Sequence, residues 1–310
     1  MAVAHQAQRS RQSFDLVEGA PPGPAARLRR ASALPRHTAG SLWDVDLAEP
    51  DIHLREALDR ALASLPPSRP ASEAPSSAPG AGSTLSRWGA GHRAVFDEAT
   101  ERLAEVWPQM LAELRVGVRQ IALLRGAAIH GFTDFTVHGA VFVNSARLHS
   151  RTGGLPGWVR LAEALVHEGT HTRCNAAALV TAFLAPAADT VAPVSTPLRA
   201  DPRPLSGLFQ QTVVLVRLVL LYRRLLESCR NRGTADAALL RALELRRGKL
   251  AAGAHQGIGT VGQHAGALTQ DGRAVLAEAR DLLEEEDRHP ALVAPPTSAS
   301  ETSAASGRGL

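Results

Sequence analysis

LAEALVHEGTHTRCN, residues 161–175, is the segment around which the rest of the chain can be organised. The turn before the histidines is apolar, which predicts a buried helix running from Trp158 to about Leu184. Residues four apart lie one turn apart on the same helical face, so His167 and His171 point the same way. We therefore expect their two imidazoles to bind one divalent metal ion.

Glu168 lies between the two histidines in sequence but on a different side of the helix. One residue corresponds to a rotation of about 100 degrees, so Glu168 flanks the site. In zinc peptidases the glutamate of this motif acts as a general base on metal-bound water. The alternative for the whole motif is a pair of helix histidines bound only by backbone groups or water.

The third metal ligand is not evident from the motif, although a metal site needs at least three protein groups. The metzincin continuation is absent, because Cys174 and Ala177 occupy the positions of its glycine and histidine. Glu227 is the candidate for a glutamate from a later helix, and His255 and His264 are further candidates. Each of these three is equally well explained as an exposed residue.

Composition narrows the classes of function. The 310 residues carry a formal net charge of +4, and arginine replaces lysine at all but one position. The basic residues do not gather into a pattern typical of nucleic-acid binding. Cys174 and Cys229 are too few for a disulfide framework.

Membrane association is also not expected. No apolar segment typical of a signal peptide follows the N-terminus. The longest apolar run, from Thr212 to Tyr222, is interrupted by Arg217 and is too short for a membrane span. We expect a cytoplasmic protein that contacts neither membrane nor nucleic acid.

The predicted fold class is mainly α: a helical metalloenzyme domain with a buried HExxH helix and a small β element. Residues 1–84 form an N-terminal region, largely disordered, with one helix near 51–65 and a linker rich in Pro, Ser and Ala. Residues 85–293 form the metal-binding domain, and residues 294–310 a disordered tail. In the metal-binding domain, the other predicted helices are Ala94–Leu114, Leu208–Cys229, Ala235–Ala252 and Gly272–Glu286. The predicted strands of this domain are Ile121–Arg125, Phe135–Val137 and Ala140–Val143. Between the helices lies a Pro-rich loop, Asp189–Ser206.

Several runs together resemble one known family. They are LAEALVHEGTH, the loop STPLRADPRPLSG at 195–207 and the apolar helix after it, with GAVFVN at 139–144 and LTQDG at 268–272. The chain resembles, over about residues 85–285, the HExxH-motif family associated with ribosomally made, post-translationally modified peptides (RiPPs). The motif helix combined with the run Asp201-Pro202-Arg203-Pro204 is more specific than the motif alone.

The resemblance implies an Fe(II)- and 2-oxoglutarate-dependent dioxygenase that hydroxylates precursor-peptide side chains at the β-carbon. His167 and His171 would then hold iron. The far carboxylate of 2-oxoglutarate needs a cation, for which Arg203 is the first choice and Arg199 the second. The alternative for Arg203 is a structural arginine that braces the Pro-rich loop.

One departure from the family pattern concerns the third ligand. The family has Gly-x-x-His after the Arg-Pro pair, whereas this chain has Gly207-Leu208-Phe209-Gln210. Gln210 can be a variant, weaker metal ligand through its carbonyl. Glu168 or His264 can instead complete the coordination, or the site can be degenerate.

Three functions therefore remain open. The leading one is an oxygenase that modifies a ribosomal precursor peptide and works beside other biosynthetic enzymes. The second is a zinc metallopeptidase with Glu168 as base and Glu227 as third ligand. The third is a non-catalytic member that binds a precursor peptide or a partner enzyme.

Overall fold

The computed structural model describes residues 42–65, 82–149, 152–197, 199–233 and 236–288. Within them the chain is mainly helical, as predicted, with a four-stranded sheet and a two-stranded hairpin. The sequence predictions for residues 1–41, for most of the linker and for the tail from 294 lie outside this part.

The larger sheet has the strand order β1-β2-β4-β3. Its central strands β2 and β4 are parallel, and β1 and β3 pair antiparallel with them at the two edges. The bounds are Ser83–Ser86 for β1, Gln120–Gly126 for β2, Gly131–Thr133 for β3 and Ala140–Asn144 for β4. The predicted strands at 121–125 and 140–143 are thereby confirmed.

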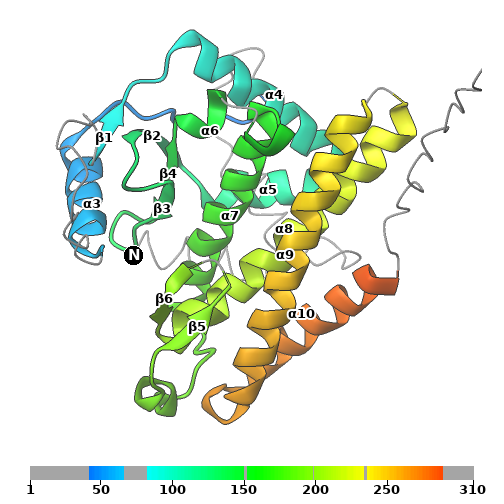
Figure 1. Cartoon of the computed structure of the whole chain (residues 1–310). Helices are drawn as coiled ribbons and strands as arrows, with labels where there is room; N and C mark the ends of the chain where they lie inside the picture. Colours follow the sequence, from blue (N-terminus) through cyan, green and yellow to red (C-terminus); the bar gives the residue numbers. More distant parts are fainter. Residues whose placement is uncertain (1–41, 66–81, 150–151, 198, 234–235, 289–310) are drawn as a thin grey trace, which may run out of the picture.

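The two faces of this sheet pack against different helices, because side chains along a strand alternate between faces. Ile121 and Leu123 belong to the main core, whereas Ala122 and Leu124 belong to a second core under α3. Helix α3 (Ile52–Ala63) begins at Asp51, whose carboxylate accepts the Leu54 N–H at 2.8 Å. Figure 1 shows α3 on one side of the sheet and α7 on the other. The central strands are therefore apolar without interruption from Ile121 to Leu124 and from Ala140 to Val143.

Two sequence predictions about the N-terminal half need correction. The domain boundary at residue 84 falls inside β1, and Trp43 and α3 pack in the cores, so the described part of the N-terminal region belongs to the same folded unit. The predicted strand at 135–137 is a turn. Asp134 causes it, because its carboxylate accepts the backbone N–H groups of Thr136 and Val137.

The predicted helix over 94–114 is two helices, α4 (Ala90–Val106) and α5 (Pro108–Gly117). Trp107 separates them with φ −151° and ψ 69°. The ring of Pro108 excludes the helical conformation from the residue before it, which explains the break.

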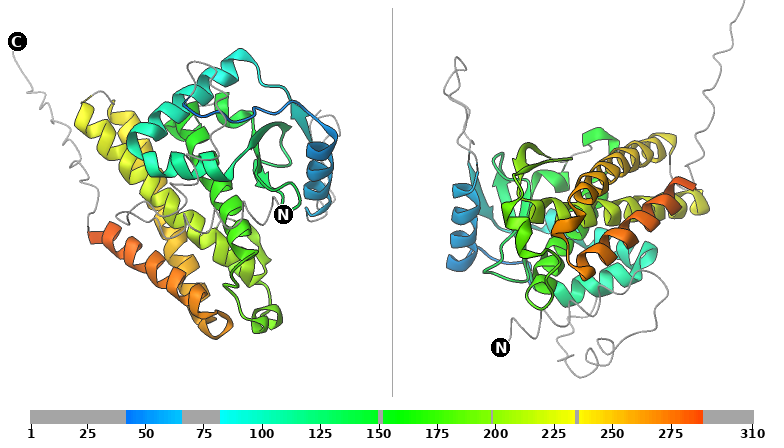
Figure 2. Two further views of the ribbon diagram at one scale, coloured as in Figure 1. Left: turned by 180° about the vertical axis from the view of Figure 1, so that it is seen from behind. Right: turned by 90° about the horizontal axis from the view of Figure 1, so that it is seen from below.

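The remaining helices form a bundle beside the sheet, and α7 lies between the sheet and α8 (Figure 1). Seen from below in Figure 2, α8, α9 and α10 lie next to one another. The bounds are α6 Ala146–His149, α7 Gly157–Ala178, α8 Leu205–Arg232, α9 Ala237–Gln263 and α10 Gln270–Arg288; the hairpin is β5 Val194–Thr196 with β6 Arg199–Arg203; short 3-10 turns span Thr152–Gly154, Pro186–Thr190 and Ala265–Ala267.

Helix α7 ends at Ala178, six residues before the predicted end, because the following segment bonds to the start of α10. Thr269 donates its backbone N–H to the Phe183 carbonyl at 3.0 Å and its hydroxyl to the Ala182 carbonyl at 2.6 Å. A Cβ on Gly272 would lie 2.0 Å from the Phe183 carbonyl oxygen, so only glycine fits there. The LTQDG run is thus an anchor for the chain leaving α7.

Helix α8 is the central helix of the core. By length and composition alone it could cross a membrane, but 78% of its most apolar window is buried inside the protein. It packs between α7 and α9. The predicted Pro-rich loop before it contains the β5–β6 hairpin, and the predicted helix at 235–252 extends to Gln263 as α9.

A buried cluster of charges joins three of the helices. Glu113 of α5 accepts two hydrogen bonds from Arg217 of α8, at 2.6 and 2.9 Å, and another from Arg173 of α7. Burial alone would raise the pKa of Glu113, but the two guanidinium charges outweigh it and hold the pKa below 4.5. One carboxylate therefore holds α7 and α8 together through two arginines.

We predict that Glu113→Gln destabilises the protein by about 3–5 kcal/mol at neutral pH, because it leaves two buried guanidinium groups without their counter-charge. The contribution of a carboxylate with a lowered pKa is present above 4.5 and is lost as the pH falls through the folded-state value. Urea unfolding at decreasing pH should therefore show the two proteins converging. Glu98→Gln, on the exposed side of α4, is the control. A constant difference down to strongly acidic pH would contradict the prediction.

Candidate metal centre

Helix α7 holds both motif histidines half-buried within an otherwise buried stretch. The ring centroids of His167 and His171 are 5.1 Å apart, with planes inclined by 59°. The two imidazoles are therefore neighbours on one face of the helix, as the spacing predicts. Two nitrogen donors at this separation can approach one metal ion.

The two middle residues of the motif serve the packing of α7. A Cβ on Gly169 would lie 2.1 Å from Leu114 Cδ2, so glycine permits α5 to approach closely. The Thr170 hydroxyl donates to the Val166 carbonyl at 2.7 Å and accepts from Arg217 Nη1 at 3.2 Å. The ion cluster of Glu113 thus reaches the motif directly and fixes its position relative to α8.

Glu168 lies under the edge strand β3. Its side chain is buried, and a Cβ on Gly131 would lie only 2.8 Å from its Oε1 atom. Glycine at this position of β3 therefore leaves the space that the carboxylate occupies. The carboxylate flanks the histidines, as the helix geometry predicts, and the strand covers it from the other side.

Asn144 fixes the loop that leads into β3. Its side-chain amide donates to the carbonyls of Gly126 and Ile129, at 2.6 and 2.8 Å, and its oxygen accepts the Ala146 N–H at 2.9 Å. Asn144 is the last residue of the GAVFVN run. Asn144 therefore fixes the position of β3, the strand that covers Glu168.

Gln210, on the second turn of α8, reaches the motif. Its Oε1 atom lies 3.0 Å from His171 Nδ1, and its Nε2 donates to Asn175 Oδ1 at 3.2 Å. The residue at which the resembled family has a histidine thus lies beside the two motif histidines. Sequence reasoning missed Asn175, although it stands one turn after His171 and so shares its face.

Of the other candidates for the third ligand, Glu227 and His255 pair with other side chains. The side chain of Glu227 is 58% exposed and pairs with Arg223. It stands seventeen residues after Gln210 on the same helix, roughly 25 Å away at 1.5 Å per residue. His255 of α9 pairs with Asp287 at 3.0 Å, and His264 follows the last residue of α9. The assignment of Glu227 as a zinc ligand is therefore wrong.

Within the described ranges, no three His, Cys, Asp or Glu side chains converge on one point. Burial raises the pKa of Cys174 to about 11, so this thiol is protonated at neutral pH in the metal-free protein. The donors gathered around the motif are therefore two imidazoles and the Gln210 amide.

The two arginines proposed for 2-oxoglutarate lie on β6, which leads directly into α8. Arg203 ends the strand half-buried, two residues before Leu205 begins the helix. Arg199 is the first residue of the strand, and its side chain lies outside the described part. Strand β6 thus brings Arg203 to the same end of α8 as Gln210.

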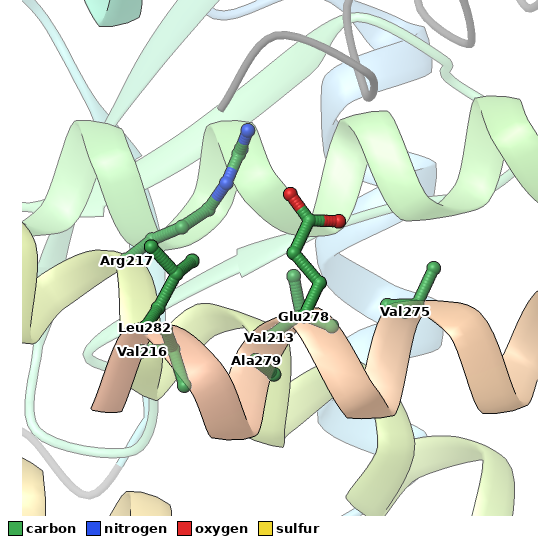
Figure 3. A pocket seen from close by; sticks show the side chains of 7 residues that line it. All are labelled: Val213, Val216, Arg217, Val275, Glu278, Ala279 and Leu282. Atoms are coloured by element: carbon green, nitrogen blue, oxygen red, sulfur yellow. The ribbon is translucent and has the colours of Figure 1, made fainter. Parts of the chain in front are cut away.

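A hollow between α8 and α10 is not part of this site. It has a volume of about 30 Å³ and is lined mostly by apolar side chains, with Arg217 and Glu278 as its charged groups (Figure 3). Arg217 is already bonded to Glu113, so the hollow lies beside the ion cluster, and none of its lining residues comes from the motif helix.

Comparison with known proteins adds no assignment. No protein-family model matches the chain, and no curated protein matches it significantly. The functional interpretation therefore rests on the residues described above.

We predict that His167→Ala removes bound metal, because the one imidazole that remains in the pair cannot retain it. Metal content after purification and dialysis, measured by mass spectrometry, gives the result. His255→Ala is the matched control, since it removes a histidine from the exposed side of α9. Stoichiometric metal in the His167 variant would overturn the site.

Proposed function

We propose that this protein is a metal-dependent enzyme that modifies a ribosomally made precursor peptide, by β-hydroxylation with Fe(II), 2-oxoglutarate and O2. The observation that carries the proposal is the 3.0 Å contact between Gln210 and His171. It joins the motif helix to the position at which the resembled family has its third histidine. Two separate parts of the sequence resemblance thus meet at one place.

The charge of the donor set fits this chemistry. The imidazoles of His167 and His171 are neutral donors, so a divalent ion held by them keeps its full positive charge. A zinc peptidase of the His2Glu type has a carboxylate among its ligands, and Glu227 is too distant to supply one. 2-Oxoglutarate carries two carboxylates and can neutralise the ion itself. Among the described residues the carboxylate ligand of a His2Glu peptidase site is therefore missing, and an anionic co-substrate is compatible with the donors present.

Arg203 is the proposed partner of the far carboxylate of 2-oxoglutarate. A planar guanidinium binds a carboxylate through two parallel hydrogen bonds. When bound, iron would activate O2 so that one oxygen atom enters a peptide C–H bond and the other enters succinate, with release of CO2. The chain's own task is to hold the co-substrate, and Arg199, at the start of β6, is the second choice for this role.

Strand β3 offers a place for a peptide substrate. In the larger sheet it pairs with β4 alone, and Glu168 lies directly beneath it at Gly131. An extended peptide can add to such an edge through backbone hydrogen bonds. It would then pass over α7 beside the histidine pair. Glu168 would be a hydrogen-bond acceptor for the peptide or for water at that point.

The decisive experiment uses protein purified without oxygen and a precursor peptide encoded next to its gene. We expect bound iron, conversion of 2-oxoglutarate to succinate, and a peptide mass gain of one oxygen atom. Arg203→Ala should raise the KM for 2-oxoglutarate steeply while the metal content is unchanged. Bound zinc with peptide cleavage that Glu168→Gln abolishes would replace the oxygenase with a peptidase. Absence of any metal would indicate a peptide-binding protein.

We predict that Gly131→Ala lowers turnover at least tenfold while metal content stays the same, because its Cβ displaces the Glu168 carboxylate. Gly248→Ala is the matched control: a Cβ there meets open space on α9, and the change should be neutral or slightly stabilising. Turnover and metal content are measured on the same samples. Unchanged turnover in the Gly131 variant would mean that Glu168 has no part in the reaction.

A further inference from the structure

The side chain of Gln210 on α8 contacts two side chains of α7, those of His171 and Asn175. His171 contacts Gln210 through its Nδ1 atom at 3.0 Å, and Gln210 contacts Asn175 through its Nε2 atom at 3.2 Å. The first and last residues stand one turn apart on α7, and the middle one stands on α8. The amide of Gln210 is therefore held at both of its ends.

The direction of each hydrogen bond follows from the atoms present. The Oε1 atom of Gln210 can only accept, so its 3.0 Å contact with His171 is a hydrogen bond when Nδ1 of that ring carries the proton. The opposite end of the amide donates to Asn175 Oδ1, which keeps Oε1 turned toward the imidazole. A neutral imidazole protonated at Nδ1 has its lone pair at Nε2.

We infer that Gln210 and Asn175 are positioning residues that hold His171 in its Nδ1–H tautomer and leave Nε2 as its metal-binding nitrogen. Gln210 then occupies the position of the family's third histidine but acts through His171 instead of on the metal. Histidine ligands generally donate their other N–H to an acceptor that fixes the ring. This inference rests on the metal site proposed above and deepens it.

The alternative geometry is a metal ion between Nδ1 and Oε1 themselves. It would make Gln210 a direct ligand and would leave no proton on Nδ1. The two arrangements place the proton and the metal on opposite nitrogens of the same ring. They can therefore be told apart by following the two nitrogens separately.

The test is nitrogen NMR on the full chain with 15N-labelled histidine, first without metal and then with zinc alone. The signal missing from His171→Ala identifies the ring among the twelve histidines. We expect a proton on Nδ1 in the metal-free protein and a zinc-induced shift at Nε2. Gln210→Leu should give a mixture of tautomers and bind zinc about 10- to 100-fold more weakly. Asn175→Leu should act in the same direction, and Asn175→Asp, which keeps the acceptor, should restore the tautomer.

Gln211→Leu is the matched control, since it makes the same change one residue along α8 and should leave the ring of His171 unaltered. An unprotonated Nδ1, zinc on Nδ1, or a tautomer that Gln210→Leu does not change would overturn the inference. If zinc shifts no histidine while the metal-free tautomer depends on Gln210 and Asn175 as stated, the proposed metal site fails and the positioning of His171 stands.

Discussion

The ion cluster of Glu113, Arg173 and Arg217 is the interaction on which the rest of the centre depends. Its carboxylate comes from α5 and its two guanidinium groups from α7 and α8. One of these groups also donates to Thr170 inside the motif. A rotation of α7 or a shift of α8 would leave a buried charge unpaired, which is costly in a medium of low dielectric constant. The cluster therefore sets the register that brings Gln210 to His171.

The sheet fixes the other side of the centre. Its alternating apolar residues bind α3 on one face and α7 on the other, so the motif helix is held between two packed layers. The edge strand β3 comes to lie over Glu168 because Asn144 ties down the loop before it. Gly131 then admits the carboxylate where any larger residue would exclude it. Strand β3 and the motif helix are thus positioned by separate contacts, and they meet at Glu168.

The spacing of apolar residues predicted those helices and strands whose own residues show a clear periodic pattern. The motif helix, strands β2 and β4 and helix α8 were found from apolar spacing, and the i, i+4 rule placed His167 beside His171. Pro108 also indicates the helix break at Trp107, but the sequence prediction treated 94–114 as one helix. Asp134 likewise turns the chain where β-forming residues suggested a strand.

Contacts between distant segments could not be read in the same way. Nothing local to Gln210 shows that it faces His171; only the family resemblance directed attention to it, and the helix packing decides the contact. Replacing an imidazole by an amide removes a possible ligand but supplies an acceptor for the Nδ1 proton of the neighbouring ring. An imidazole oriented in this way binds metal through one nitrogen only. A glutamine at residue 210, where the resembled family has a histidine, can therefore orient a neighbouring imidazole without binding metal itself.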